Sequence, residues 1–206
     1  MSITLTVSTY LKQALEEIAQ EALDGRTAIE REKVFYCKIK DFNSLETASR
    51  KVYQEQWEIR PKETNTGMIR VRKTSDGELS LTTKVFDGDS RKETEIEITE
   101  DIFDSFRCIS PGGMIKTRYV WPIPDTKFKW EVDVYQNPDG SPYEWCKVDL
   151  ECDNLEMDNP PFPIEFTTVI SGKRDSISEE ERIFIDTLFK TKFITPNPVL
   201  AKQSTE

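Results

Sequence analysis

The sequence predicts an α+β fold in which an antiparallel sheet is accompanied by a few helices. About eight short segments alternate apolar and polar residues, which is the spacing of strands. Turn signals separate them, among them the segments SDG, DGDS, PGG and NPDG. A few other segments carry apolar residues at helical spacing behind a capping residue. A chain of 206 residues is ordinary for one such domain, so we expect a single domain over residues 1–206.

A helix comes first along the chain. In residues 8–24, Leu11, Leu15 and Ile18 repeat at helical spacing, and the segment ends at Asp24-Gly25. Strands are expected at residues 29–40, 57–60, 67–73, 78–85, 92–98, 114–121, 127–135 and 144–152, and residues 164–170 are a further candidate. Further helices are expected at residues 41–54, 99–106 and 176–190. Residues 196–206 have the composition of a loose tail.

Composition excludes several classes of function. The net charge of −10 argues against a general affinity for DNA, RNA backbone or anionic lipid. No apolar run approaches the roughly 18 residues of a membrane span, and the first residues lack the features of a secretion signal, so we expect a cytoplasmic protein. The four cysteines form no CxxC pair and are expected to be reduced thiols. With no histidine, any chemistry depends on carboxylates, lysine, arginine or bound metal.

The alternation sorts each strand into an apolar face and a charged face. Periodicity alone favours a two-layer sheet whose charged face meets water. However, the charged face carries pairs of one sign, such as Glu30 with Glu32 and Arg70 with Arg72. Such pairs require opposite charges nearby. The alternative is a closed barrel with the charged face inward, where acidic and basic strands confront one another. Such an interior suits a polyanion bridged by metal, since hard cations bind carboxylates while arginine and lysine bind phosphate.

The order of the charged segments resembles the CYTH superfamily, the triphosphate tunnel metalloenzymes. The segment "IEREKVF" resembles the family's first-strand signature, glutamate-x-glutamate-x-lysine. The segment "GMIRVRKTSDGELSLTTKV" is similar to its paired-arginine strand with the following hairpin. The segments "TEIEI", "KTRYVW", "KWEVDVY" and "CKVDLECD" then follow in the family's order. Each motif alone is common in charged proteins, so the resemblance depends on their order.

The resemblance implies an eight-stranded antiparallel closed barrel, a tunnel with a charged interior and helices packed outside. It also implies hydrolysis of a triphosphate-bearing substrate with Mg²⁺ or Mn²⁺, or less often cyclisation, as in an adenylyl cyclase of the same fold. The substrate would be inorganic triphosphate, a nucleoside triphosphate or an RNA 5′ end. Carried over by position, the metal ligands are Glu30, Glu32, Asp149 and Glu151; the phosphate-binding residues are Arg70, Arg72, Lys84, Lys116 and Arg118; and the residues ordering a second metal or the attacking water are Glu97, Glu131 and Asp133.

One position departs from the family pattern. Val34 stands where the signature has lysine, and period two places it on the same strand face as Glu30 and Glu32. A lysine on another strand, Lys84, Lys116 or Lys129, is expected to supply the missing ammonium group. The departure also leaves open a protein that binds a nucleotide or polyphosphate without turnover.

Overall fold

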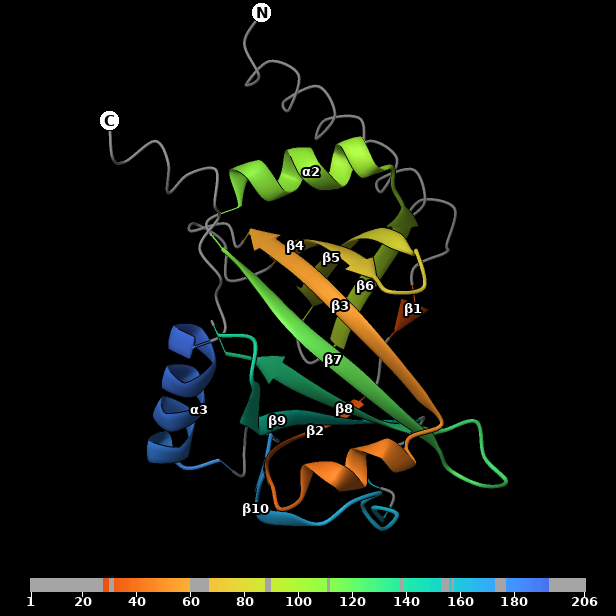
Figure 1. Cartoon of the computed structure of the whole chain (residues 1–206), viewed down its shortest axis with the longest axis vertical. Helices are drawn as coiled ribbons and strands as arrows, with labels where there is room; N and C mark the ends of the chain where they lie inside the picture. The colour runs from red at the N-terminus through yellow and green to blue at the C-terminus, as the bar shows by residue number, and fades with distance from the viewer. Residues whose placement is uncertain are drawn as a thin grey trace, which may run out of the picture. The chain divides into compact units, whose positions relative to one another are not determined.

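The computed structural model describes residues 28–29, 32–59, 67–87, 90–110, 112–137, 139–152, 156, 158–172 and 177–192 (Figure 1). The helix predicted at residues 8–24, the tail predicted at 196–206 and Glu30 lie outside them. The chain divides into two compact units. Unit 1 comprises Met1–Glu30, Gln54–Met114 and Thr195–Glu206, and unit 2 comprises Arg31–Tyr53 and Ile115–Ile194. None of the described helices is long and apolar enough to cross a membrane.

The strands are mostly those that the alternation predicts. The elements of unit 1 are β1 (Ala28–Ile29), β4 (Gly67–Thr74), β5 (Leu79–Asp87), β6 (Ser90–Glu97) and α2 (Glu100–Ile109). Those of unit 2 are β2 (Glu32–Ile39), η1 (Phe42–Thr47), β8 (Lys129–Gln136), β9 (Pro142–Glu151), β10 (Phe166–Ser171) and α3 (Glu179–Lys192). Residues of β3 (Arg50–Ile59) and of β7 (Gly113–Pro122) fall in both units.

The prediction of a closed eight-stranded barrel is wrong. The strands form a ten-stranded sheet in the order β1-β6-β5-β4-β3-β7-β8-β9-β2-β10, and every strand pairing described is antiparallel. Closure requires hydrogen bonds between the first and last strands. Instead, β10 takes the second edge of β2, and β1 pairs with β6, so the described sheet is open with β1 and β10 at its ends. The predicted α+β balance also shifts toward strands, because the described part holds only α2, α3 and the short η1 as helices.

The helix predicted at residues 41–54 accounts for much of that shift. Only Phe42–Thr47 is helical, as a 3-10 turn whose cap Asp41 accepts a hydrogen bond from the Asn43 backbone. The chain is already extended at Arg50, where β3 begins. Val52, Gln54 and Gln56 alternate with less buried residues along β3. Strand pairing on both sides of β3 therefore outweighs the helical propensity of this segment.

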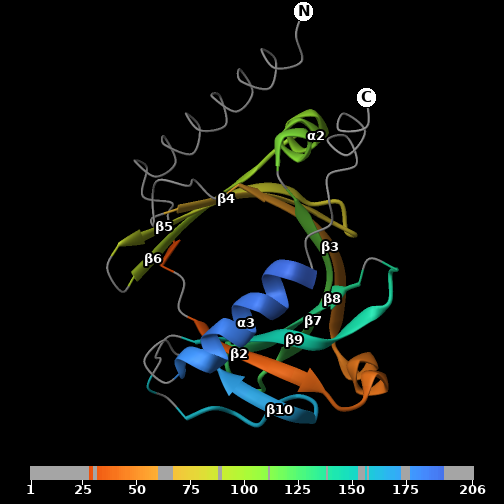
Figure 2. The ribbon, with the colours of Figure 1, turned by 90° about the vertical axis from the view of Figure 1, so that its left-hand side faces the viewer.

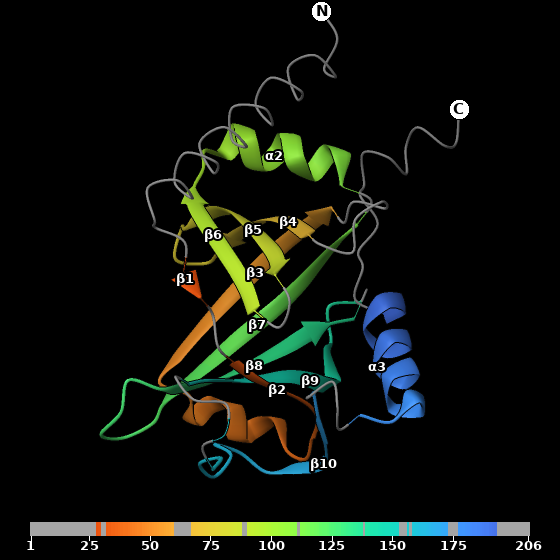
Figure 3. The same ribbon diagram turned by 180° about the vertical axis from the view of Figure 1, so that it is seen from behind.

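Unit 1 buries its apolar strand face beneath α2 (Figure 3). The helix begins after Thr99, as predicted, and carries Glu100 and Asp101 in its first turn, where the helix dipole favours negative charge. Phe103 and Phe106 are almost fully buried on it. They pack with Trp57, Val71, Leu81, Ile96 and Ile98 in one cluster. The parity assignment of these strands is thereby confirmed.

Unit 2 has a core of its own on the apolar faces of β2, β8 and β9. Trp130 is its largest fully buried side chain, and its ring centroid lies 4.9 Å from that of Phe162 and 6.0 Å from that of Phe35. Buried residues of the same cluster include Val132, Val134, Cys146, Val148 and Leu150. All four cysteines of the chain are free thiols, as expected. Since the apolar parity faces this core, the other parity of the same strands carries the charged residues.

Candidate functional site

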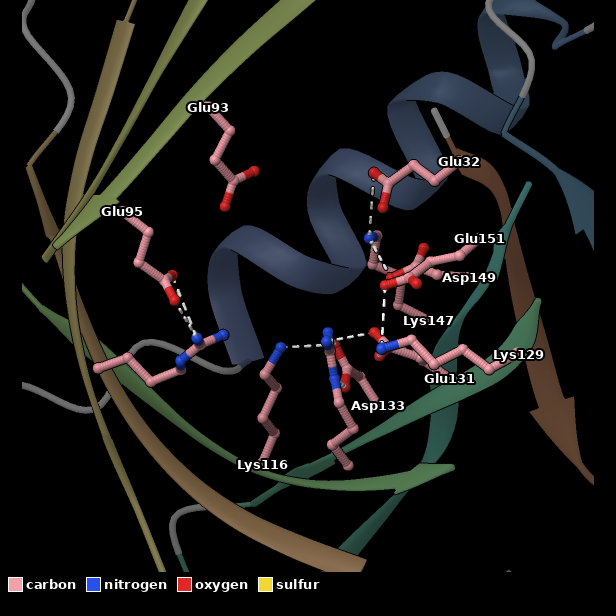
Figure 4. Close-up of polar contacts among 12 residues, drawn as sticks. Glu32, Glu93, Glu95, Lys116, Lys129, Glu131, Asp133, Lys147, Asp149 and Glu151 are labelled. Atoms are coloured by element: carbon pink, nitrogen blue, oxygen red, sulfur yellow. Dashed lines mark hydrogen bonds and ion pairs between the residues drawn. The ribbon is translucent and has the colours of Figure 1, made fainter. Parts of the chain in front are cut away.

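The charged faces of β7, β8, β9 and β2 bring acidic and basic side chains into direct register in unit 2. Arg118 lies opposite Asp133, which in turn lies opposite Lys147. Glu131 lies opposite Asp149, and Glu151 opposite both Lys129 and Glu32. We call the following residues the unit 2 cluster: Glu32, Lys116, Arg118, Lys129, Glu131, Asp133, Lys147, Asp149 and Glu151. Figure 4 labels all of them except Arg118.

Asp133 anchors two cations of the unit 2 cluster. Its side chain is 1% exposed. Arg118 donates from Nε to Oδ1 at 2.7 Å and from Nη2 to Oδ2 at 2.8 Å, and Lys116 donates to Oδ2 as well. Burial alone would raise the pKa of Asp133, but the Arg118 guanidinium and the Lys116 ammonium outweigh burial and hold it well below its usual range. Asp133 is therefore a permanent carboxylate that fixes both cations in place.

Asp149 is the carboxylate of the cluster that is least well compensated. The residue is 2% exposed, and Lys147 Nζ donates to its Oδ2 at 2.6 Å, whereas its Oδ1 has no hydrogen-bond partner in the structure. Burial raises the pKa of Asp149 to about 6; Lys147 opposes the rise, and the charges of Glu32 and Asp133 add to it. A buried oxygen with no hydrogen bond, beside other negative charge, is costly unless a cation approaches it.

Lys147 lies between two carboxylates. Its Nζ is 2.6 Å from Asp149 Oδ2 and 3.8 Å from Glu32 Oε1 (Figure 4). Burial alone would lower the pKa of Lys147, but Asp149, Glu32 and Asp133 outweigh burial and raise it, so the side chain stays an ammonium. Lys147 was not among the predicted site residues. Its signal in the sequence is its alternation with Asp149 and Glu151 on one strand face.

The remaining charges of the cluster are also paired. Arg118 forms an ion pair with Glu131 in addition to Asp133. Lys129 Nζ lies 2.8 Å from Glu131 Oε1 and 3.2 Å from Glu151 Oε1. Burial is the main reason why the pKa of Glu151 is raised, and the Glu131 charge adds to the rise. Both carboxylates thus share the Lys129 ammonium.

Two tyrosines that the prediction missed share this face. Tyr135 follows Asp133 at the same parity on β8, and Tyr36 follows Glu32 on β2. Tyr135 is buried, and burial followed by the charges of Asp133 and Asp149 raises its pKa well above the usual value. Burial likewise raises the pKa of Tyr36. Both phenols are therefore hydrogen-bond donors at neutral pH.

Helix α3 lies on the same face, beside β2 and β9 (Figure 2). Trp145 has the parity of Lys147 and Asp149 on β9, and its ring centroid lies 5.2 Å from that of Phe184 on α3 in an edge-on arrangement. Asp186 of α3 is close enough to Tyr36 to raise its pKa further. The helix thus shields the Trp145 end of the charged face, while Phe184 itself remains 41% exposed.

Unit 1 carries a second group of ion pairs, on β4, β5 and β6. Arg72 Nη2 donates to both carboxylate oxygens of Glu95 at 3.1 Å, and Thr82 Oγ1 donates to Glu95 at 2.8 Å. Arg70 Nη2 donates to Glu93 at 3.2 Å, and Lys84 forms an ion pair with the same carboxylate. The predicted phosphate-binding residues Arg70, Arg72 and Lys84 thus lie together within unit 1.

The structure divides the predicted site residues between the units. Of the predicted metal ligands, Glu32, Asp149 and Glu151 lie together in unit 2, and Glu30 is outside the described residues. Lys116, Arg118, Glu131 and Asp133 also lie together there. Glu97 belongs to unit 1, where it lies in register with Ser80. The roles assigned to all these residues stay predictions.

Whether the unit 2 cluster can hold a metal ion depends on the ligand atoms that its side chains offer. Among the described residues there is no ready-made group of three or more carboxylate, thiol or imidazole ligands. However, Mg²⁺ is commonly held by one or two carboxylates together with the phosphates of its substrate. Asp149, with its buried Oδ1, and its neighbour Glu32 fit that description.

Comparison with known proteins gives little more. No protein-family model matches the chain, and no curated protein matches it. Among solved structures, it is similar to a protein from Bacillus halodurans whose crystal structure is described as that of a "putative adenylate cyclase". The two are 10% identical, the TM-score is 0.46, and the match covers 62% of this chain and 82% of the other. A likeness of this size carries no statement about function.

Proposed function

We propose that this protein is a metal-dependent hydrolase of triphosphate-bearing substrates and that the unit 2 cluster is its site. The observation that carries the proposal is the Asp149 carboxylate, which is buried, lacks a hydrogen bond at Oδ1 and is repelled by Glu32 and Asp133. Such a carboxylate gains most from a hard divalent cation. Charged groups held in an unfavourable environment are frequent at functional sites.

Asp149 and Glu32 would hold the Mg²⁺ or Mn²⁺ ion. When bound, the ion would withdraw charge from the phosphate oxygens and acidify a bound water molecule. The phosphates would complete its coordination, since these two side chains offer few ligands.

The cations of the cluster would bind the triphosphate itself. Lys116 and Arg118 are held close together by Asp133, so two positive groups are already oriented on one face of β7. Because the cations are oriented before the substrate binds, the entropic cost of reaching the transition state is lower. Arginine stabilises charge that develops on a transferring phosphoryl group. In this scheme Asp133 is a positioning residue, because both of its oxygens are already engaged.

The proposal is tested by phosphate release with Mg²⁺ or Mn²⁺ from tripolyphosphate, ATP, GTP and RNA with a 5′-triphosphate. We expect release from at least one of them, and loss of release on removal of metal with EDTA. Cyclic AMP formation from ATP is assayed in parallel. If cyclic AMP forms, the activity is cyclisation and not hydrolysis. Binding without either product would leave a binding protein in place of the enzyme.

Variants of the proposed metal ligands test whether the activity resides in the unit 2 cluster. Glu32→Gln and Asp149→Asn keep the side-chain shape but remove the charge that a hard cation needs, so metal-dependent turnover should fall at least a hundredfold. Glu144→Gln is the matched control. Glu144 lies on β9 with Asp149, but its carboxylate is exposed and lies 3.0 Å from Lys38. Full turnover of Asp149→Asn at saturating Mg²⁺ would contradict the metal assignment.

A further inference from the structure

The position of Lys147 has a consequence for how the unit 2 cluster binds its ligands. Its ammonium group contacts Asp149 Oδ2 at 2.6 Å and lies 3.8 Å from Glu32 Oε1, so it occupies the space between the two carboxylates proposed to hold metal. Glu32 and Asp149 lie on the neighbouring strands β2 and β9, which are paired in register, so the two carboxylates start from positions close to the same ammonium. An ammonium and a divalent cation would therefore compete for the same oxygens.

The competition is electrostatic. A divalent cation on Asp149 and Glu32 would lie a few ångströms from the Lys147 charge, where like charges in a partly desolvated site repel strongly. The divalent ion attracts the carboxylates more strongly than a single ammonium charge does. Metal binding is thus expected to displace the Lys147 Nζ, and the energy of breaking its ion pairs is subtracted from the metal affinity.

A displaced ammonium needs a new anionic partner. The register neighbour of Lys147 on β8 is Asp133. Both Asp133 oxygens already accept hydrogen bonds, from Arg118 and Lys116. Phosphate oxygens that arrive together with the metal offer an alternative partner, because a lysine side chain is long and flexible enough to turn toward them.

Building on the function proposed above, we propose that Lys147 couples the binding of metal and of polyphosphate. Without ligands it is the counter-ion of Asp149 and Glu32, and when the metal takes these carboxylates it turns to the phosphate. Each ligand therefore raises the affinity for the other, as thermodynamic linkage requires. The species that the cluster recognises is the metal–polyphosphate complex, and either component alone binds weakly.

The test measures binding rather than turnover. Mn²⁺ affinity is measured alone by the electron paramagnetic resonance signal of free Mn²⁺. Calorimetry then compares imidotriphosphate, whose nitrogen bridges resist hydrolysis, with and without Mn²⁺. For wild type we expect the complex to bind at least about tenfold tighter than imidotriphosphate alone. Lys147→Met should bind Mn²⁺ alone about tenfold tighter than wild type and should lose most of the gain from combining the ligands.

Lys38→Met is the matched control. Lys38 is also a strand lysine that forms an ion pair with a carboxylate of β9, Glu144, but this pair is exposed. It should leave both affinities unchanged. Mn²⁺ affinity that is unchanged or weaker in a folded Lys147→Met protein, with coupling intact, overturns the inference even if wild type hydrolyses triphosphate. Wild type that binds neither Mn²⁺ nor the complex overturns the proposed function as well.

Wild-type protein provides a second measurement that does not depend on the folding of a variant. Acetylation of Lys147 by acetic anhydride, followed by mass spectrometry, reports how free its amino group is. Mn²⁺ alone should increase the rate of labelling, because it displaces the ammonium from the carboxylates, and Mn²⁺ with imidotriphosphate should decrease it again. A labelling rate that does not respond to Mn²⁺ at concentrations that saturate the protein overturns the inference.

Discussion

Arg118 and Asp133 face each other across β7 and β8, and the guanidinium donates two hydrogen bonds, of 2.7 Å and 2.8 Å, to the two carboxylate oxygens. This fork-to-fork geometry is the strongest form of a protein ion pair. Since the Asp133 side chain is 1% exposed, the pair has little help from water. The loss of the Asp133 carboxylate would therefore leave buried cations without their partner.

Replacing Asp133 with Ala should destabilise the protein by roughly 3–5 kcal/mol, because it removes the carboxylate that both Arg118 and Lys116 contact while these cations stay buried. Urea unfolding measures the loss. Glu46→Ala is the control: its pair with Lys51 is 3.4 Å long and exposed, and such pairs contribute about 0–1 kcal/mol. Equal losses in the two variants would mean that the Asp133 ion pairs do not stabilise the fold.

Strand parity predicts much of this site. It does not predict whether the sheet closes. Alternation alone places Arg118 and Asp133 on one face, because side chains repeat every two residues along a strand. Whether a sheet closes depends on which distant segments pair at its edges. The pairing of β10 with β2 joins Val169 to Cys37, far apart in sequence, and no local pattern marks β10 as an edge strand. Parity therefore identified the charged face, but not the open sheet.

The same distinction explains why Lys147 was missed. The prediction that the ammonium that Val34 lacks comes from Lys84, Lys116 or Lys129 stays a prediction, and it did not include Lys147. Which lysine approaches Glu32 is decided by the register of β2 against β9, which sets Val34 opposite Asp149 and Tyr36 opposite Lys147. A shift of that register by two residues would present another side chain. Register arises from pairing across the whole sheet, so it could not be obtained from either strand alone.

The pKa of Asp149 predicts a change of stability with pH. Because the folded pKa of about 6 lies above the ordinary value of 3.8, the folded protein binds more protons than the unfolded chain between about pH 4 and pH 6. The contribution of Asp149 to stability is therefore present in full below about pH 4 and is lost as pH rises through 6. The loss amounts to about 3 kcal/mol at 1.36 kcal/mol per unit.

The measurement compares wild type with Asp149→Asn by urea unfolding at several pH values in EDTA. The asparagine variant lacks this titration, so its stability relative to wild type should rise by about 3 kcal/mol between pH 3 and pH 7. Titrations of groups distant from Asp149 cancel in the difference. A difference that is constant with pH, or that falls, would show that the Asp149 carboxyl is not held in an unfavourable environment.

Val34 gives the last prediction, because it lies directly opposite Asp149 in the β2–β9 pairing. A lysine at this position would place a second ammonium near the oxygens that Lys147 already contacts. Val34→Lys should therefore lower the affinity for Mg²⁺, by roughly tenfold for one added charge a few ångströms away, and change the rate of phosphate release without abolishing triphosphate binding. The concentration of Mg²⁺ that gives half-maximal release measures the effect.

Val34→Met is the control for side-chain length without charge. It is needed because Val34 is tightly packed: a Cβ added at Gly172 would meet the Val34 backbone oxygen at 2.8 Å and its Cβ at 2.9 Å, so a longer side chain at position 34 has steric effects of its own. If Met and Lys lower the Mg²⁺ affinity equally, the effect is steric and the charge is irrelevant. If Val34→Lys creates phosphate release in a protein whose wild type binds metal and triphosphate but releases none, the wild-type chain is a binding protein and its missing lysine is the reason.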